Sequence, residues 1–101
     1  MVSKTLLKPS DTPSTNQAYV IKVNGEIEQL GHQPTLAEAQ KLVGGYVEQM
    51  PRSYTRNPRQ TIVGDEEGKL KHKPVNPVAS ELVFCTLVGG ILVLEGWRSL
   101  K

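Results

Sequence analysis

Short stretches of the chain alternate apolar and polar positions or repeat them at helical spacing, and each stretch predicts one element. AYVIKVNGEIEQL holds two β-type runs around Asn24-Gly25, the strongest local signal for a hairpin. A two-residue turn would place Ile27 opposite Lys22. A three-residue loop with Gly25 in a bulge would instead place Ile21 opposite Ile27. The second register pairs apolar side chains together and opposite charges together, and we favour it.

PTLAEAQKLVGG predicts a helix with both ends specified. Thr35 can accept a hydrogen bond from a first-turn amide while Glu38 reaches back to the Thr35 amide, which is the reciprocal capping box. Gly44 can adopt the left-handed conformation that ends a helix, and Gly45 begins a tight turn. An apolar stripe runs along one face of this helix, at Leu36, Ala39, Leu42 and Val43.

The middle of the chain predicts a strand, a loop and a second hairpin. GYVEQM follows the helix directly, and either Tyr46 or Val47 faces the core, depending on the register. PRSYTRNPR has two prolines, three arginines and no periodicity, which predicts a loop. QTIVGDEEGKLK then predicts a hairpin whose polar turn ends at Gly68, with positive φ.

Two further elements follow. NPVASELV predicts a short helix capped by Asn76, with Pro77 at the first helical position. ILVL is apolar at every position, as in a central strand. Gly89 and Gly90, just ahead of it, suit a bulge or a close approach of two backbones.

These elements together predict an α+β fold, with one mainly antiparallel sheet of hairpins and one or two packed helices. Residues 1–16 combine Ser, Thr, Pro, Asp and Asn with few apolar residues, which predicts a flexible tail. Residues 17–101 then form a single domain, because a chain of 101 residues is too short for two independent cores.

Several of these motifs resemble, as a set, an uncharacterised family of small proteins found mostly in tailed bacteriophages and some large DNA viruses. The matching segments are the LAEAQKLVGG helix entering YVE, the acidic turn DEEGKL, PVNPVA and the final strand, over about residues 19–96. The chain departs from the family pattern at Asp65, where Asn is usual, and in the insertion from Pro51 to Arg59. The resemblance implies a viral accessory protein inside an infected cell, and it implies no biochemical activity.

Composition narrows the setting of the protein. The apolar fraction of 38% is below that of an ordinary globular chain, so we expect modest stability or self-association. The run from Leu82 to Leu94 is shorter than the roughly 20 residues of a membrane helix, and the N-terminus does not read as a signal peptide. Cys85 is the only cysteine, which excludes an intrachain disulfide. We therefore expect an intracellular protein without membrane association, and the resemblance implies that the cell is an infected host, in whose cytoplasm the protein would lie.

The motifs of common catalysis are missing from the sequence, so we expect no catalytic residue, cofactor or metal. The glycine pairs lack the spacing and polarity of a phosphate-binding loop. Cys85, with no histidine at a supporting spacing, is expected to be a small buried apolar residue. The two histidines, His32 and His72, do not have the paired spacing of zinc ligands. The strand carboxylates are expected to be solvated, namely Glu26, Glu28, Glu48 and Glu95.

The basic middle of the chain gives the candidate binding residues. Flexible arginines beside a stackable ring can bind phosphate backbones or acidic proteins, and alternate lysines on a strand would share one face. The candidates are Arg52, Tyr54, Arg56, Arg59, Lys69, Lys71 and Lys73. The net charge is only +2, which is low for a nucleic-acid binder.

Three hypotheses follow. The first is a non-enzymatic module that binds a host or viral protein. The second is binding of nucleic acid or a small anionic ligand through the region from Arg52 to Lys73. The third is an enzyme of unrecognised type.

Overall fold

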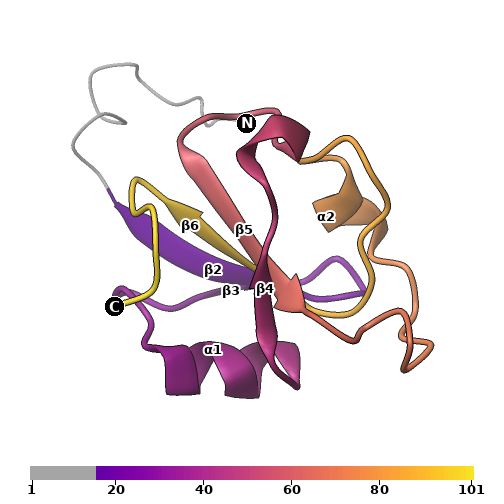
Figure 1. The fold of residues 1–101 in the computed structure, drawn as a ribbon. Helices are drawn as coiled ribbons and strands as arrows, with labels where there is room; N and C mark the ends of the chain where they lie inside the picture. Colours follow the sequence, from indigo (N-terminus) through magenta and orange to yellow (C-terminus); the bar gives the residue numbers. More distant parts are fainter. Residues whose placement is uncertain (1–15) are drawn as a thin grey trace.

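The computed structural model describes residues 16–101, and within them five strands form one antiparallel sheet in the order β3-β2-β6-β5-β4 (Figure 1). The strands are β2 (Gln17–Ile21), β3 (Ile27–Gln29), β4 (Val47–Gln49), β5 (Gln60–Asp65) and β6 (Ile91–Glu95). Helix α1 (Leu36–Val43) packs on one face of the sheet, and the short α2 (Pro77–Ser80) packs on the other. The predicted α+β class is therefore confirmed. The predicted tail lies, apart from Asn16, outside the described residues.

The first hairpin has the register that pairs apolar with apolar. Ile21 lies opposite Ile27, and the Lys22 amide donates to the Glu26 carbonyl at 2.8 Å. Gly25 has a φ of +92°, the positive value expected for the bulge of the three-residue loop. Turn chemistry and side-chain matching together selected the register.

Helix α1 begins and ends as predicted. The Glu38 amide donates to Thr35 Oγ1 at 3.2 Å, the Thr35 amide donates to Glu38 Oε1 at 2.9 Å, and Gly44 has a φ of +83°. The predicted apolar stripe is wrong at Leu36, which is 50% exposed, because the helix packs into the core only through its later residues, at Ala39, Leu42 and Val43. The helix thus contributes a short contact.

The open choice at the start of β4 is settled. Tyr46 is 68% exposed, while Val47 packs against the core. In the predicted loop before β5, residues Arg52–Tyr54 form a single 3₁₀ turn, η1.

The predicted second hairpin is wrong. Strand β5 already pairs with β4 on one side and β6 on the other, so the segment after it has no free edge to join. Residues 66–72 form turns instead, and the positive φ in this segment belongs to His72 at 58° rather than to Gly68. Gly68 is a close-packing position, since a β-carbon there would lie 3.0 Å from Val88 Cγ2.

Asn76 caps α2 as predicted and also joins three parts of the chain. Its Oδ1 accepts from the Ala79 amide at 3.0 Å. Its Nδ2 donates to the carbonyls of Ile21 at 2.9 Å and Gly89 at 2.8 Å. The side chain is fully buried, so these bonds replace water completely.

Strand β6 lies at the centre of the sheet, as its continuous apolar run predicted, and separates two small cores. The α1 face buries Ala18, Val20, Val63, Leu92 and Leu94, with Trp97 and Leu100 packed against them. The α2 face buries Ile21, Ile62, Val83, Leu87, Ile91 and Val93. No helix within residues 16–101 has the length and apolarity to cross a bilayer.

Replacing Asn76 with Ala should lower the free energy of unfolding by about 3 kcal/mol, because the change removes the cap and leaves two carbonyls without this buried donor. Thr35→Ala is the matched control, since it removes an exposed cap and should cost about 1 kcal/mol. Urea unfolding of both variants measures the difference. Equal losses would show that the Asn76 bonds across the fold contribute little.

Candidate binding surface

The loop of residues 51–59 is fixed to the body of the protein by backbone bonds to the segment after α2. The Phe84 amide donates to the Tyr54 carbonyl at 2.8 Å, and the Arg56 amide donates to the Leu82 carbonyl at 3.0 Å. Thr55 forms a bridge with Val83, which is buried in the core. Two segments far apart in sequence thus present their side chains together.

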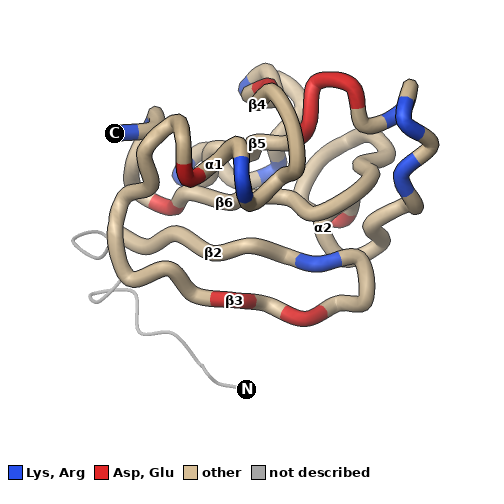
Figure 2. Tube along the Cα trace, turned by 90° about the horizontal axis from the view of Figure 1, so that it is seen from below, with Lys and Arg blue, Asp and Glu red and all other residues tan. Residues whose placement is uncertain are grey.

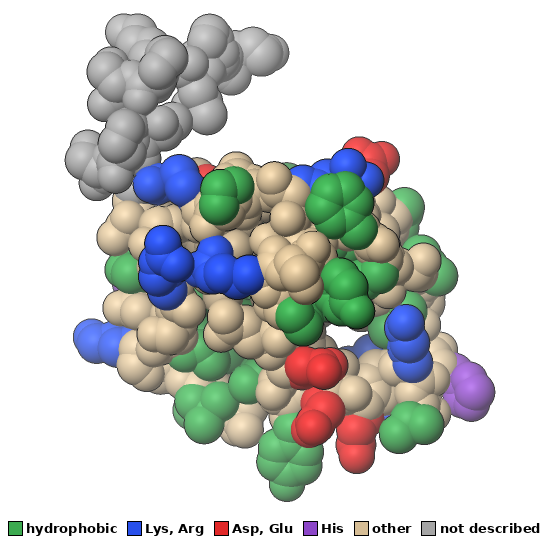
Figure 3. Space-filling model, turned by 45° about the horizontal axis from the view of Figure 1, so that its top comes forward, with side chains coloured by type: hydrophobic (Ala, Val, Ile, Leu, Met, Phe, Trp, Pro, Cys, Tyr) green, Lys and Arg blue, Asp and Glu red, His purple; other side chains and the backbone are tan. Residues whose placement is uncertain are grey.

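These contacts create an exposed aromatic group that contains an arginine. The Arg56 guanidinium carbon lies 4.3 Å from the centroid of the Phe84 ring, a cation–π geometry. Tyr54 is 47% exposed and Phe84 is 60% exposed. We call Tyr54, Arg56 and Phe84 the aromatic–arginine surface; Figure 3 shows exposed hydrophobic side chains beside basic ones on this side of the molecule.

Phe84 was missed by the sequence analysis. It is the only phenylalanine in the chain and follows a four-residue helix, so no periodicity marks it as exposed. Its place beside Arg56 depends on a tertiary contact that the sequence does not show.

The other two arginines of the predicted site lie elsewhere. Arg52 closes its own loop, because Nη1 donates to the Pro58 carbonyl at 2.7 Å and Nη2 donates to Thr61 Oγ1 at 3.5 Å. Arg59 is half-buried near Glu95, and its positive charge favours the ionised form of that carboxylate. The four loop residues therefore do not form one face.

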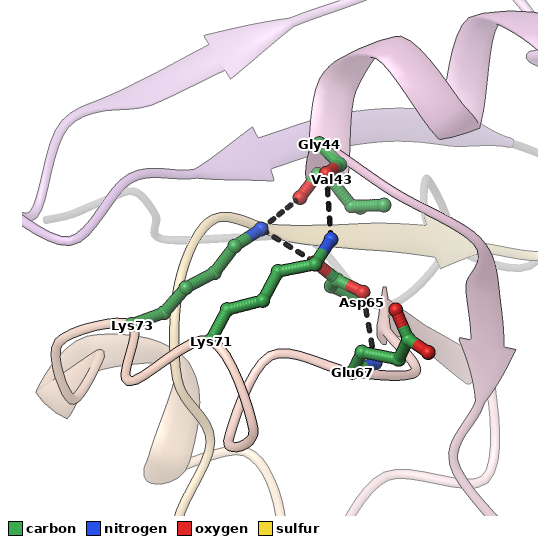
Figure 4. A network of polar contacts seen from close by, with 6 residues as sticks. All are labelled: Val43, Gly44, Asp65, Glu67, Lys71 and Lys73. Atoms are coloured by element: carbon green, nitrogen blue, oxygen red, sulfur yellow. Dashed lines mark hydrogen bonds and ion pairs between the residues drawn. The ribbon is translucent and has the colours of Figure 1, made fainter.

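Lys71 and Lys73 converge on the side chain of Asp65, which is 1% exposed (Figure 4). Their Nζ atoms lie 2.9 Å and 2.7 Å from Asp65 Oδ2. Lys71 also donates to the Gly44 carbonyl at 3.2 Å, and Lys73 to the Val43 carbonyl at 2.7 Å. The two lysines thus neutralise the carboxylate and bind the C-terminal end of α1, where cations are favoured.

The pKa of Asp65 is held far below the usual range for an aspartate. The main cause is the hydrogen bond from Lys73, followed by that from Lys71, and the Glu67 amide adds a third donor at 2.9 Å from Oδ1. Asp65 is therefore ionised throughout the neutral range.

Lys69, in contrast, does not join this cluster and lies at the cleft described below. Figure 2 shows the remaining cations spread over several sides of the fold.

Both glycine pairs pack around this cluster. A β-carbon at Gly45 would lie 2.6 Å from Lys71 Nζ, and one at Gly44 would lie 3.1 Å from Lys73 Nζ. A β-carbon at Gly89 would lie 2.8 Å from Lys73 Cδ. The Lys73 side chain therefore passes between the two glycine pairs, and at Gly89 the close neighbour is this side chain rather than a second backbone.

A cleft of about 190 Å³ lies beside β4 on the α2 face of the sheet. Its apolar lining includes Met50, Ile62, Leu87 and Ile91, and its polar lining includes Glu48 and Glu66. In Figure 3, acidic side chains gather next to a hollow beside the hydrophobic ones.

Cys85 also lines this cleft and is exposed, so the prediction that it is buried is wrong. The reason is that residues 84–86 bend over the edge of the cleft outside the cores. No histidine is among the cleft residues, so this lining offers the thiol no imidazole partner. Within residues 16–101, no group of three or more His, Cys, Asp or Glu could hold a metal.

Glu95 differs from the predicted solvated carboxylate. It is half-buried and accepts from Gln17 Nε2 at 2.7 Å, Tyr19 Oη at 2.6 Å and Gln60 Nε2 at 3.0 Å. Burial opposes its charge, but these hydrogen bonds outweigh that cost and lower its pKa. Burial, together with the carboxylate, raises the pKa of Tyr19. A carboxylate whose ionised form is stabilised in this way is a poor general base. Its hydrogen bonds instead join the three neighbouring strands β2, β6 and β5.

Stability should depend on pH through Asp65. Because its pKa is lower in the folded state, its contribution is present above the unfolded value of about 4 and is lost as the pH falls below it. Asp65→Asn should destabilise the protein at pH 7, and the gap to wild type should narrow between about pH 5 and pH 2. Urea unfolding across this range measures the gap. Glu67→Gln is the control, because Glu67 is an exposed carboxylate of the same turn, and it should leave the dependence of the unfolding free energy on pH unchanged. A difference between Asp65→Asn and wild type that stays constant with pH would contradict the role of the Asp65 charge.

Comparison with known proteins places the chain in a family without a known activity. No curated protein and no solved structure matches it. A family model described as a domain of unknown function (DUF3846) matches residues 12–98, which agrees with the expected membership of an uncharacterised family; the viral origin stays a prediction. The chain thus belongs to the DUF3846 family of domains of unknown function.

Proposed function

We propose that the protein is a small non-enzymatic accessory module that binds a host or viral protein in the cytoplasm of an infected cell. The observation that carries the binding role is the aromatic–arginine surface, where two half-exposed rings and a guanidinium are held on a fixed backbone. The viral setting of the proposal comes from the sequence resemblance.

The chemistry of this surface suits a protein partner. Tyrosine, phenylalanine and arginine are enriched at the centres of protein interfaces, where a few such residues supply most of the affinity. The backbone bonds from Phe84 and Arg56 already order the loop, so binding costs less conformational entropy than it would for a mobile loop. The adjoining cleft extends this surface with further apolar contacts.

Binding of nucleic acid or a small anion has less support. Lys71 and Lys73 are held by Asp65 and the end of α1, and Arg52 donates to its own loop. A phosphate backbone needs several cations along one track, and these side chains do not form one.

Loss of the aromatic–arginine surface should abolish partner recovery. Tagged wild-type protein and a Tyr54→Ala/Phe84→Ala double variant are used to capture proteins from infected-cell extract. We expect at least a tenfold loss of the specific partner, because truncating one such hot-spot residue typically costs about 2 kcal/mol. Leu36→Ala, an exposed apolar residue on the opposite face of the sheet, is the control. Unchanged recovery by the double variant would remove this surface from the proposal.

A titration with labelled DNA and RNA tests the alternative. We expect weak binding that responds little to salt. Affinity that falls steeply between about 50 and 200 mM salt, and that Arg56→Ala and Lys69→Ala reduce further, would favour the nucleic-acid function.

A further inference from the structure

Strand β4 is one edge of the sheet, and among the backbone hydrogen bonds of residues 16–101 none occupies its outer side. The Glu66 amide donates to the Tyr46 carbonyl at 2.8 Å, and the Met50 amide donates to the Ile62 carbonyl at 2.7 Å. In an antiparallel ladder the bonded positions alternate, so the backbone groups of Val47 and Gln49 point away from β5. An extended chain could bond to both residues.

The side chains of β4 show what such a chain would meet. Glu48 lies opposite Gly64, and the same register places Met50 opposite Ile62, so both side chains lie on the α2 face and line the cleft. Residues of an added strand opposite Glu48 and Met50 would point to this same face. Alternate side chains of the added strand would therefore reach the cleft.

The size of the cleft suits one apolar side chain. Its volume of about 190 Å³ is below the roughly 300–1,000 Å³ of small-molecule sites. Gly64 keeps its floor open, since a β-carbon there would lie 3.1 Å from Ile91 Cδ1. A leucine-sized group next to Met50 would fill the space.

The charges next to β4 favour a basic residue in the added strand. Glu48 and Glu66 line the cleft and take part in none of the ion pairs found within residues 16–101. The lining also contains Asp65, whose charge is balanced by Lys71 and Lys73, and one cation, Lys69. One positive charge therefore stands against the two glutamates. A second copy pairing about Glu48 would set two glutamates opposite each other, which is unfavourable.

We propose that β4 binds an extended segment of the partner protein as an additional strand, with a basic side chain opposite Glu48 and an apolar side chain, two positions away, in the cleft beside Met50. This inference rests on the proposed protein-binding function and specifies how the partner is bound, as an extended strand at the edge of the sheet.

Two heptapeptides of equal composition test the pattern. Ser-Thr-Leu-Thr-Lys-Thr-Ser places Leu and Lys on one side of an extended chain, whereas Ser-Thr-Thr-Leu-Lys-Thr-Ser places them on opposite sides. In titrations followed by amide NMR, the first should bind at least tenfold more tightly and slow hydrogen exchange of the Val47 and Gln49 amides at least tenfold. Equal binding of the two peptides, or no binding, overturns the proposal.

Matched variants locate the strand. Gln49→Pro removes an outward amide, which an edge strand tolerates, and should lose the first peptide. Gln29→Pro is the control, because the Leu30 amide bonds to the Ala18 carbonyl and Gln29 therefore points outward on the other edge, β3. Glu48→Lys should weaken the Lys peptide at least tenfold and favour its Lys-to-Glu counterpart, a test that stands even where Gln49→Pro fails to fold.

Two results separate this inference from the proposed function. A cellular partner that is lost with Tyr54→Ala/Phe84→Ala but retained by Gln49→Pro and Glu48→Lys refutes strand addition and leaves protein binding in place. A dimer in sedimentation that Gln49→Pro dissociates makes the occupant a second copy and overturns the proposal. Loss of the partner with both sets of variants supports both statements.

Discussion

The carboxylate of Asp65 is the point on which the arrangement of this small fold depends. It ends β5, and its two lysine partners come from the turns that follow, so the charge cluster folds residues 66–73 back onto the end of α1. A carboxylate held away from water is stable only if positive charges and hydrogen-bond donors replace the lost hydration. This requirement fixes the conformation of residues 66–73, which have few apolar side chains to do so. The glycine pairs supply the space for that path.

This cluster also decides which charges are left for binding. Lys71 and Lys73, two of the predicted binding residues, are instead paired with Asp65. The groups left for a partner are the aromatic–arginine surface and the acidic side chains of the cleft. The net charge of the chain therefore says little about its binding face, because the same residue type has a structural role in one place and an exposed one in another.

The parts of the fold that the sequence predicts are those determined by neighbouring residues. The register of the first hairpin follows from Gly25, the start of α1 from Thr35, and the start of α2 from Asn76, since each depends on bonds within a few positions. The second hairpin could not be rejected in the same way, because it is excluded by β4 and β6 pairing with β5.

The candidate site was predictable only in part, for the same reason. Tyr54 and Arg56 are noticeable in the sequence, but Phe84 joins them through a contact across the fold, and the cleft forms only when β4 and the segment at Leu87 lie side by side. Glu95 looks like any strand carboxylate until the two strands on either side of it, β2 and β5, bring two amides and a hydroxyl to it.

The position of β6 has a consequence for biosynthesis. Of the five strands in residues 16–101, β6 is made last by the ribosome, yet in the sheet it lies between β2 and β5. Among these strands it alone links the β2–β3 pair to the β4–β5 pair. Until it emerges from the exit tunnel, the nascent chain holds two separate hairpins with unpaired edges, and neither core can close. Chains stalled before β6 would expose those edges to chaperones and proteases, whereas a chain that extends through it can fold in one cooperative step.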